Sequence, residues 1–192
     1  MKGTNTGRLV LCAMFVALIT VGAYTRVPLP FGDYYTLQLL FVLLAGLLLG
    51  AKQGAIATAV YVLLGICGLP VFAGGGGPGY IFTPSFGYLI GFIATSWSAG
   101  LIVERLKPIS LKHMVVACYS ALVVAYLFGL PYKYFILNHY MHTPVTWMVI
   151  LAACFPIDLP CDIILCFFCA YLAKKLYPIT NRFFSNCIGT IN

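Results

Sequence analysis

Two aspartates, Asp158 and Asp162, are the side chains in this sequence best placed to do chemistry, because they interrupt a long apolar run. Residues four apart lie on the same face of a helix, and ionisable groups inside an apolar segment indicate a functional site. Asp162 lies 12 residues before Lys174, about 18 Å of helix, which places it in the outer half of a bilayer. We interpret Asp162 as a ligand-binding acid. The alternative, which is compatible with it, is that Asp162 stabilises a helix start near Pro160 through the helix dipole.

A glycine-rich segment, Gly68–Gly79, contains almost no polar side chain and separates two long apolar runs. Glycines let a backbone approach a bound molecule closely, because no side chain holds it away. The segment lacks the Lys-Ser/Thr pair that follows the glycines of a phosphate-binding loop, so we do not interpret it as a nucleotide site. Irregular backbone at membrane depth must be buried in protein or line a cavity. The segment therefore predicts a ligand-binding site.

The remaining reactive residues do not form a recognisable catalytic or metal-binding pattern. The three histidines have no serine, cysteine or carboxylate in a catalytic order. Four cysteines cluster in an apolar helical region without histidine partners, and apolar cysteines behave as small hydrophobes; they are Cys154, Cys161, Cys166 and Cys169. We therefore expect no enzymatic activity, no metal site and no resident cofactor.

The composition is that of a membrane protein. Of 192 residues, 62% are apolar and only 8% are charged, against about 25% charged residues in a typical soluble domain. No polar stretch is long enough to build a soluble core, so residues 1–192 are expected to form a single transmembrane substrate-binding domain. We expect a multi-pass protein of the cell membrane, in contact with lipid. The net charge of +7 then reflects topology and anionic lipid, and no nucleic-acid partner is expected.

The apolar runs predict an all-α integral membrane protein with six transmembrane helices. Residues 36–70 have only Lys52 and Gln53 as a polar break, which predicts a tight hairpin of two helices. The last run is too long for one untilted helix, and its prolines divide it into a short lead-in and a span that begins near Pro160. The expected spans are residues 9–25, 36–51, 54–70, 84–103, 114–132 and a final one within 147–176.

The basic residues predict that both termini are cytoplasmic. Nine of the eleven lysines and arginines fall on the side of the termini, and only Arg26 and Lys133 fall on the other. The glycine-rich segment, residues 26–35 and residues 133–146 are therefore expected to face outward. Glu104 is interpreted as part of a solvated cytoplasmic turn. In the first span, Ala13 and Ala17 are small residues at helical spacing, which favours close approach of a partner helix.

Several sequence segments together resemble the BioY family, the biotin-specific membrane subunits of energy-coupling factor (ECF) transporters. The match covers nearly the whole chain, and its motifs are specific only in combination. The segments are Thr36-Leu37-Gln38, Leu44-Ala45-Gly46-Leu47-Leu48-Leu49-Gly50, Gly68-Leu69-Pro70-Val71-Phe72-Ala73-Gly74-Gly75 and Pro84-Ser85-Phe86-Gly87-Tyr88-Leu89-Ile90-Gly91-Phe92.

This resemblance implies six helices, an outward-facing biotin pocket capped by the glycine-rich segment, and binding without catalysis. It also implies that Ala13 and Ala17 dock on a transmembrane coupling subunit, which two cytoplasmic ATPase subunits drive. Asp162 is then expected to accept hydrogen bonds from the ureido ring of biotin, with Gln38 nearby. The substrate-binding residues that we predict are Thr36, Gln38, Phe72, Ala73, Gly74, Gly75, Tyr80, Tyr88 and Asp162.

The sequence departs from the family pattern at one position that matters for the ligand. The family's last helix carries a lysine three residues after the aspartate, and both residues contact biotin; here Leu165 follows Asp162 at that spacing. We therefore expect the backbone amides of Gly74–Gly77 to receive the carboxylate. The departure also keeps open a different small vitamin or a biotin precursor as ligand. A solitary biotin facilitator, a membrane enzyme and a purely structural membrane protein are further alternatives.

Overall fold

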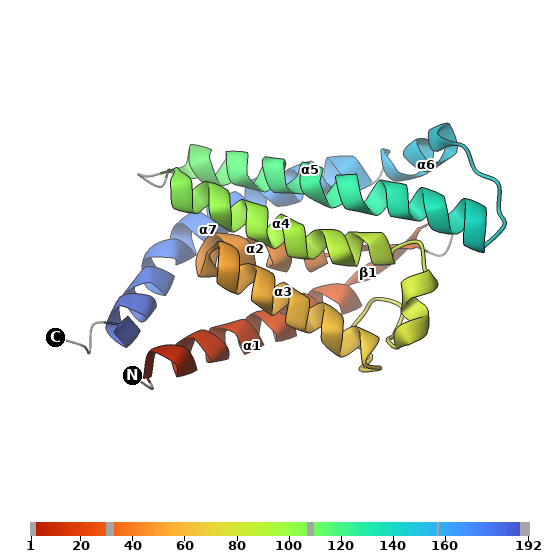
Figure 1. Cartoon of the computed structure of the whole chain (residues 1–192). Coiled ribbons are helices and arrows are strands. Elements are labelled where there is room, and N and C mark those ends of the chain that lie inside the picture. Colours follow the sequence, from red (N-terminus) through yellow and green to blue (C-terminus); the bar gives the residue numbers. More distant parts are fainter. Residues whose placement is uncertain (1–2, 30–32, 107–109, 157, 189–192) are drawn as a thin grey trace.

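The structure is a computed structural model that describes residues 3–29, 33–106, 110–156 and 158–188. Within these residues the chain forms an elongated bundle of helices with one small sheet (Figure 1). The helices are α1 (Gly3–Tyr24), α2 (Gln38–Leu49), α3 (Ala51–Ile66), α4 (Phe86–Arg105), α5 (Leu111–Phe135), α6 (Trp147–Cys154) and α7 (Asp158–Ile188). Two short helical turns, η2 (Pro78–Phe82) and η3 (Ile136–Tyr140), follow the glycine-rich segment and α5. The predicted helical fold is confirmed for most of the described chain.

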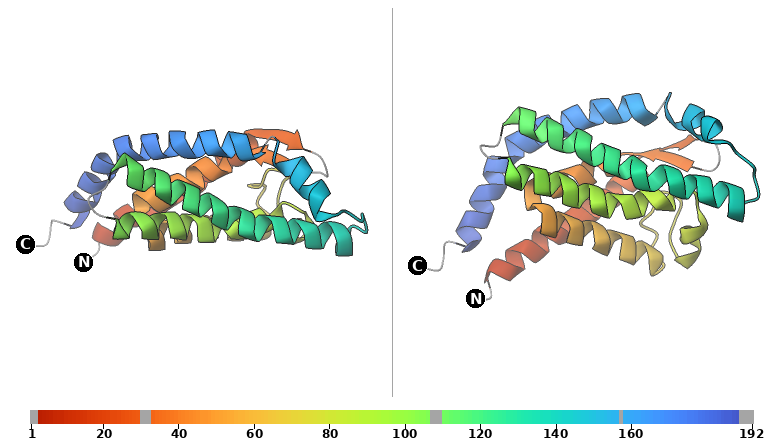
Figure 2. Two further views of the ribbon diagram at one scale, coloured as in Figure 1. Left: turned by 90° about the horizontal axis from the view of Figure 1, so that it is seen from above. Right: turned by 45° about the horizontal axis from the view of Figure 1, so that its top comes forward.

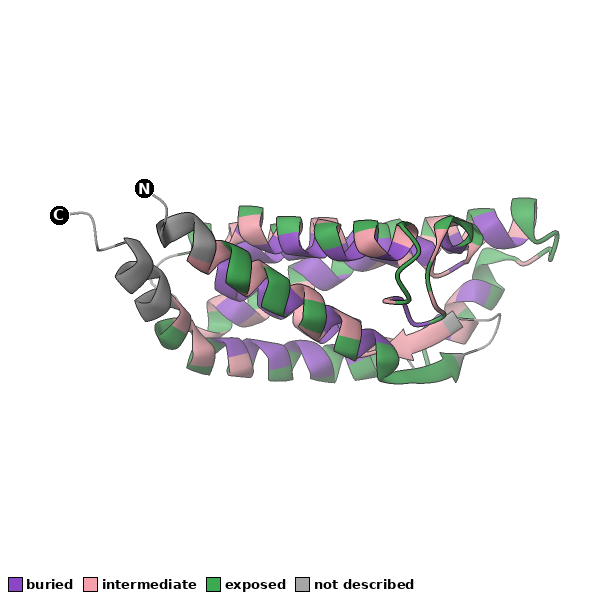
Figure 3. Ribbon diagram, turned by 90° about the horizontal axis from the view of Figure 1, so that it is seen from below, coloured by how far each residue is buried: buried purple, intermediate pink, exposed green. Residues whose placement is uncertain are grey.

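Helix α2 is the centre of the bundle, and α1, α3, α4 and α7 pack around it (Figures 1 and 2). All of its residues except Phe41 are buried, as expected for a helix that is apolar on every side. Gly46 allows close contact with α4, because a side chain at Gly46 would overlap the backbone carbonyl oxygen of Ser96. Burial therefore follows the inner faces of the surrounding helices, and their outer faces are exposed (Figure 3).

The two ends of the bundle are built differently. Helix α1 begins and α7 ends at one end, which we call the base; the glycine-rich segment lies at the other, which we call the loop end (Figure 2). At the base, α2 and α3 form the predicted hairpin. Gly50 makes the turn with a φ of +84°, a conformation that suits glycine. Glu104 was predicted to be a solvated side chain, but it has a structural contact. Its Oε1 accepts a hydrogen bond from the Ala51 N–H at 2.9 Å, so it caps the start of α3.

A small antiparallel sheet at the loop end corrects the prediction of an all-α chain. Strands β1 (Arg26–Leu29) and β2 (Asp33–Thr36) pair so that Arg26 faces Thr36 and Val27 faces Tyr35. The prediction treated residues 26–35 as an outer loop and began a helix at Thr36. Val and Tyr favour strands, but four-residue strands are too short to give a distinct periodic pattern. The hairpin holds consecutive tyrosines, Tyr34 and Tyr35, over the end of the bundle.

The last apolar run is divided as predicted. Helix α6 ends at Cys154 and α7 begins at Asp158, two residues before Pro160, with a bend of 48° between the two helices. Proline at the start of a helix removes no needed hydrogen bond, since the first N–H groups have no partner within the helix. This break places Asp158 and Asp162 in the first turns of α7, at the loop end of the bundle.

Helix α5 extends three residues beyond the predicted end of its span at residue 132, so Lys133 lies inside this helix. Helix α5 continues past Pro131 to Phe135. The Lys133 side chain is only 1% exposed, and its Nζ lies 3.4 Å from the Cys154 Sγ in α6. Lysine can bury its long aliphatic stem in an apolar contact, so a charged residue does not always mark the end of a helix.

Helix length and composition account for part of the predicted membrane topology. Among the described residues, three stretches are long and apolar enough to cross a membrane, and α6 with α7 form a fourth if the bent pair is one span. Helices α2 and α3 have 12 and 16 residues, about 18 and 24 Å, against a hydrocarbon core of about 30 Å. The three stretches are Gly7–Tyr24, Phe86–Arg105 and Leu111–Tyr140.

Candidate functional site

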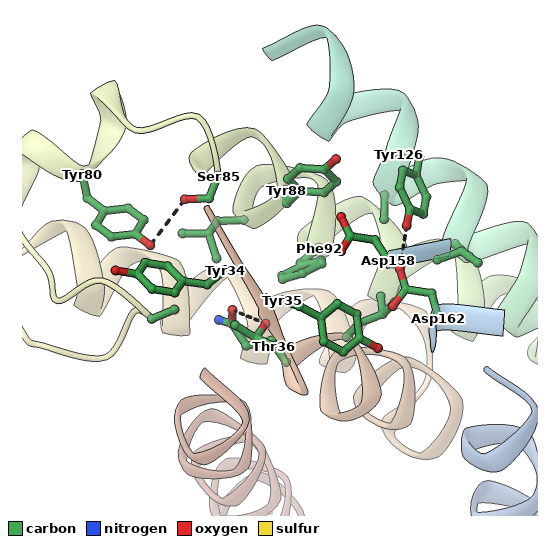
Figure 4. Close-up of a pocket in the computed structure, with 16 residues that line it drawn as sticks. Tyr34, Tyr35, Thr36, Tyr80, Ser85, Tyr88, Phe92, Tyr126, Asp158 and Asp162 are labelled. Carbon is green, nitrogen blue, oxygen red and sulfur yellow. Dashed lines mark hydrogen bonds between the residues drawn. The ribbon is translucent and has the colours of Figure 1, made fainter. Parts of the chain in front are cut away.

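A cavity lies at the loop end of the bundle, between the sheet, α2, α4, α5 and the start of α7 (Figure 4). It contains about 700 Å³ of space, part of which is open to the outside. Its walls combine apolar side chains with a few polar groups, an arrangement that fixes the orientation of a ligand. The lining residues are Tyr34, Tyr35, Thr36, Gln38, Leu39, Ala73, Tyr80, Ser85, Tyr88, Leu89, Phe92, Leu122, Ala125, Tyr126, Asp158 and Asp162.

The two aspartates of α7 form the acidic side of this cavity. Asp162 is 7% exposed, and its Oδ2 accepts a hydrogen bond from the Tyr126 hydroxyl at 2.8 Å. A carboxylate has about four acceptor positions, so Asp162 keeps the capacity to accept further donors from a ligand. Asp158 is one helical turn away and lines the same wall. The early start of α7 therefore aims both carboxylates into the cavity (Figure 4).

Tyr35 approaches the acidic side from the sheet. Burial raises the pKa of the Tyr35 hydroxyl well above its usual value, and the nearby carboxylate of Asp162 raises it further. A hydroxyl that keeps its proton can donate a hydrogen bond. Figure 4 shows Tyr35 directed toward Asp162, whereas Tyr34 is directed toward Tyr80. The alternation of side chains along β2 thus gives the two tyrosines different parts of the cavity.

Aromatic rings from α4 and α5 form the wall next to the acidic side. The Tyr88 and Tyr126 rings meet edge to face, with centroids 6.0 Å apart and an interplanar angle of 87°. Such edge-to-face pairs are a favourable aromatic geometry. Phe92 and Leu122 also line the cavity. The wall is therefore suited to an apolar ring whose edge carries polar groups.

A chain of hydrogen bonds connects the cavity wall to the glycine-rich segment. The Thr36 hydroxyl donates to Gln38 Oε1 at 2.9 Å, and Gln38 Nε2 donates to the Tyr61 hydroxyl. Tyr61 donates in turn to the Val71 carbonyl at 3.0 Å. Gln38 is 4% exposed, and both ends of its amide have partners within the protein. We therefore assign Gln38 a positioning role, because it fixes the segment relative to the wall.

The glycine-rich segment is folded back on itself and anchored by Phe72. Phe72 is fully buried, and a side chain at Gly65 of α3 would overlap its ring. The Gly75 N–H donates to the Phe72 carbonyl at 3.1 Å, and the Gly77 N–H donates to the Gly65 carbonyl at 2.7 Å. Two of the four amides predicted to receive a carboxylate therefore already have partners. The predicted row of four available amides does not fit this geometry.

The structure separates the predicted substrate-binding residues into two groups. Those that line the cavity are Thr36, Gln38, Ala73, Tyr80, Tyr88 and Asp162. Those that do not are Phe72, which holds the segment in place, and Gly74 and Gly75, which shape it. Sequence reasoning missed Tyr35 and Tyr126, and it weighed Asp158 without including it. Helical spacing offers a signal for Asp158, which is one turn from Asp162.

The predicted partner-binding residues lie away from the cavity, on α1. Ala13 and Ala17 are both exposed, and the exposed side of α1 is turned away from the bundle core (Figure 3). Larger apolar residues on α1, such as Val10 and Met14, are also exposed. An exposed apolar face with small residues is suited either to lipid or to another helix.

Comparison with known proteins shows the family of this chain. The model of the BioY family matches residues 1–182. The chain belongs to the BioY family. A probable biotin transporter BioY of Lysinibacillus sphaericus is 38% identical over 179 residues, covering 93% of this chain and 91% of the relative. A biotin transporter BioY of Thermotoga maritima is 40% identical over 139 residues, covering 70% and 76% of the two chains.

A solved structure supports the BioY fold over almost the whole chain. It is a crystal structure of the S-component for biotin from an ECF-type ABC transporter, with a TM-score of 0.71 and 25% identity. The match covers 92% of this chain and 93% of the other. In this BioY-family chain, Leu165 is 7% exposed and belongs to the apolar core, and it does not line the cavity. The position where the family pattern predicts a lysine therefore contributes only packing.

Proposed function

We propose that this chain is the biotin-capturing subunit of a membrane uptake system. The observation that carries the proposal is the cavity in which Asp162, held by Tyr126, faces aromatic walls in a chain of the BioY family. Biotin combines a polar ureido ring, an apolar sulfur ring and a flexible acidic tail. The cavity offers a buried acceptor for the ureido ring and an apolar wall for the sulfur ring.

Asp162 is the acceptor for the ureido N–H groups. A buried donor without a partner costs about 1–3 kcal/mol, so each ureido N–H needs an acceptor inside the cavity. Tyr126 uses one acceptor position on Oδ2, and the ligand takes over the position on the carboxylate toward which Tyr35 is directed in the free chain. The Tyr35 hydroxyl is then placed to donate to the ureido carbonyl oxygen. Together, the acid and the tyrosine distinguish a cyclic urea from an apolar ring.

Aromatic side chains contact the sulfur ring of biotin, and the glycine-rich segment covers the cavity. Tyr88 and Phe92 contact the apolar part of the ligand, and Tyr80, which follows the glycine-rich segment Gly68–Gly79, lines the same cavity. The segment covers the entrance after the ligand has bound. No chemical conversion of the ligand is part of this function, and the chain acts as a binding subunit.

The membrane arrangement is also proposed. Six spans, with α2 and α3 as short spans inside the bundle and α6–α7 as one broken span, place the base in the cytoplasm and the cavity outside. The exposed face of α1 around Ala13 and Ala17 docks on a transmembrane coupling subunit, and two cytoplasmic ATPase subunits drive release. A ligand shifts a two-state equilibrium only by its differential affinity, so the ATPases supply the bias for inward delivery across the cell membrane.

Calorimetry with the purified, detergent-solubilised chain tests the binding step. We expect the unmodified chain to bind biotin, and Asp162→Asn to weaken binding by about 10- to 100-fold, because hydrogen bonds to a charged group contribute about 1.5–3 kcal/mol. Glu104→Gln, an acid-to-amide change at the base, is the matched control and should leave affinity unchanged. A folded chain that does not bind biotin would mean that the ligand is another small vitamin or a biotin precursor.

Uptake by cells tests the partner step separately. Ala13→Leu with Ala17→Leu adds bulk to the exposed face of α1, far from the cavity. We expect the double variant to bind biotin normally in calorimetry but to lose uptake in cells that carry the ATPase module. Uptake that survives both substitutions would indicate a solitary facilitator.

A further inference from the structure

The cavity has a strong asymmetry of charge. Asp158 and Asp162 lie on one side of it, and Tyr34 and Tyr80 lie on the other (Figure 4). Among the residues that the structure describes, no arginine, lysine or histidine lines the cavity. An anionic group placed beside the two aspartates would be repelled, because like charges interact strongly at short range in a low-dielectric site. A ligand with one acidic end must direct that end toward the two tyrosines.

Arg26 is the cation at the rim on the side of these tyrosines. It is the first residue of β1 and faces Thr36 across the sheet. Facing residues of an antiparallel pair project from the same face, and Tyr34, two residues from Thr36, shares that face. The guanidinium carbon of Arg26 lies 5.0 Å from the centre of the Tyr34 ring, which is cation–π geometry. Thr36 and Tyr34 both line the cavity. Arg26 does not line it but contacts a residue of its wall.

The other basic side chains lie too far from the cavity wall to contact an acidic group of a ligand there. Lys133 is buried, and its ammonium contacts the Cys154 Sγ in α6, away from the cavity wall. The remaining lysines and arginines whose side chains the structure describes lie toward the base. They are Arg8, Lys52, Arg105, Lys112, Lys174 and Lys175. Among the described residues, Arg26 is thus the cation that stacks on an aromatic ring of the cavity wall.

We infer that Arg26 binds the carboxylate of the ligand at the rim of the cavity and supplies the positive charge that Leu165 does not. This assignment rests on the proposed function, in which the ligand is biotin. The planar guanidinium stacks on aromatic rings and matches the two oxygens of a carboxylate. Arg26 is exposed, so its long side chain has room to turn from the Tyr34 ring toward the tail of a bound ligand. The same residue then determines the preference for an acidic over a neutral ligand.

Calorimetry with two ligands, biotin and biotin methyl ester, tests this inference. The ester has no charge on the tail but keeps the ureido and sulfur rings. We expect Arg26→Gln to weaken binding of biotin about tenfold and to leave binding of the ester unchanged, because only biotin carries the charge. Arg26→Lys should restore part of the loss, since it keeps the charge without the planar fork. Arg105→Gln, the same change at an exposed arginine of the base, is the matched control.

The outcomes separate this inference from the proposed function. A preference for biotin over its ester that disappears in Arg26→Gln supports the assignment. An equal loss of affinity for both ligands in Arg26→Gln would overturn the assignment in favour of a structural role for Arg26. A preference for biotin that persists in Arg26→Gln and disappears in Lys133→Met would overturn it in favour of Lys133. Failure of the unmodified chain to bind biotin or its ester would instead overturn the proposed function. Salt gives a further readout: the biotin affinity should fall with ionic strength in the unmodified chain and less in Arg26→Gln.

Discussion

The loop end and the base of this bundle are built from the same helices but use different side chains. At the loop end, hydroxyl groups hold the structure together: Tyr24 and Tyr61 donate to the carbonyls of Pro70 and Val71, and Tyr132 donates to that of Ile81. Toward the base, glycine and alanine bring α2, α3 and α4 into direct backbone contact, as at Gly46 and Ser96. One end is held by directional polar contacts and the other by close packing.

This difference indicates how binding and stability are divided within the chain. Close backbone packing fills space at high density, so it tolerates little change in volume. Hydrogen bonds from single hydroxyls contribute about 0.5–1.5 kcal/mol each, so the loss of one leaves the fold intact and shifts the geometry of the cavity. We therefore expect substitutions at the base to act on stability and substitutions at the loop end to act on affinity.

The largest contrast is expected from adding the same side chain at two glycines. In Gly46→Val the new side chain would overlap the backbone carbonyl of Ser96, which cannot move without shifting α4. We expect a loss of about 3 kcal/mol or more, which lowers the melting temperature by roughly 6–12 °C. In Gly65→Val the new side chain would overlap the Phe72 ring, which belongs to the glycine-rich segment. We expect a smaller loss of stability in Gly65→Val than in Gly46→Val. Biotin affinity should fall about tenfold or more, because displacing the segment lowers the population of the conformation that binds biotin.

Thermal unfolding in detergent and calorimetry on the same samples check this pair. The comparison fails if Gly46→Val melts like the unmodified chain, or if Gly65→Val keeps full affinity. Gly79→Ala is a suitable control, because a Cβ there meets open space and should change neither quantity.

A second contrast uses two tyrosines of α5 that both reach α7. Tyr126 donates to the Asp162 carboxylate at 2.8 Å, and Tyr119, two turns nearer the base, donates to the Ile163 carbonyl at 3.1 Å. Because Tyr126 orients the acid that binds the ligand, we expect Tyr126→Phe to weaken biotin binding about tenfold. Tyr119→Phe removes the same hydroxyl outside the cavity and should leave affinity unchanged. Equal affinities in the two variants, measured by calorimetry, would contradict the assigned role of Asp162.

The sequence was sufficient to predict the features that depend on apolar runs and on proline. The hairpin of α2 and α3, the break before α7 and the position of Asp162 near a helix start all follow from local patterns. Local patterns fail where the chain is short and mixed, as in the strands Arg26–Leu29 and Asp33–Thr36. Four residues of alternating character do not outweigh the helical pattern on either side.

The missed residues of the site share a physical cause, which is that they depend on tertiary contact. Tyr126 sits in an apolar helix like any packing residue, and only the approach of α7 gives its hydroxyl the Asp162 carboxylate as partner. Phe72 shows the opposite case: its place beside the glycine-rich segment predicts a ligand contact, but in the structure its ring packs on Gly65 and does not line the cavity. The fold decides which of two similar aromatic residues faces the cavity and which faces the protein.

A third, smaller effect is expected from breaking the connection between the cavity wall and the glycine-rich segment. Tyr61→Phe removes the donor to the Val71 carbonyl and the acceptor for Gln38 Nε2. We expect biotin affinity to fall about threefold, mainly through faster dissociation, because the segment is less firmly held while direct ligand contacts remain. Stopped-flow dissociation kinetics measure this. Tyr171→Phe, an exposed tyrosine on α7, is the control, and an unchanged dissociation rate in Tyr61→Phe would show that the hydrogen-bond chain does not hold the cover.

The smallest effect is expected at the polar contact of the base. Glu104→Gln keeps an oxygen near the Ala51 N–H but removes the charge that complements the start of α3. A charge at a helix N-terminus contributes about 0.3–1 kcal/mol, so we expect the melting temperature to fall by no more than about 4 °C and biotin affinity to stay constant. Unfolding curves and calorimetry on the same preparation check both. A change in affinity without a change in stability would mean that the base communicates with the cavity, and the division between the two ends would then have to be abandoned. Because α2 passes from the Gly50 turn to Gln38 at the cavity, this helix would be the element that carries such a signal.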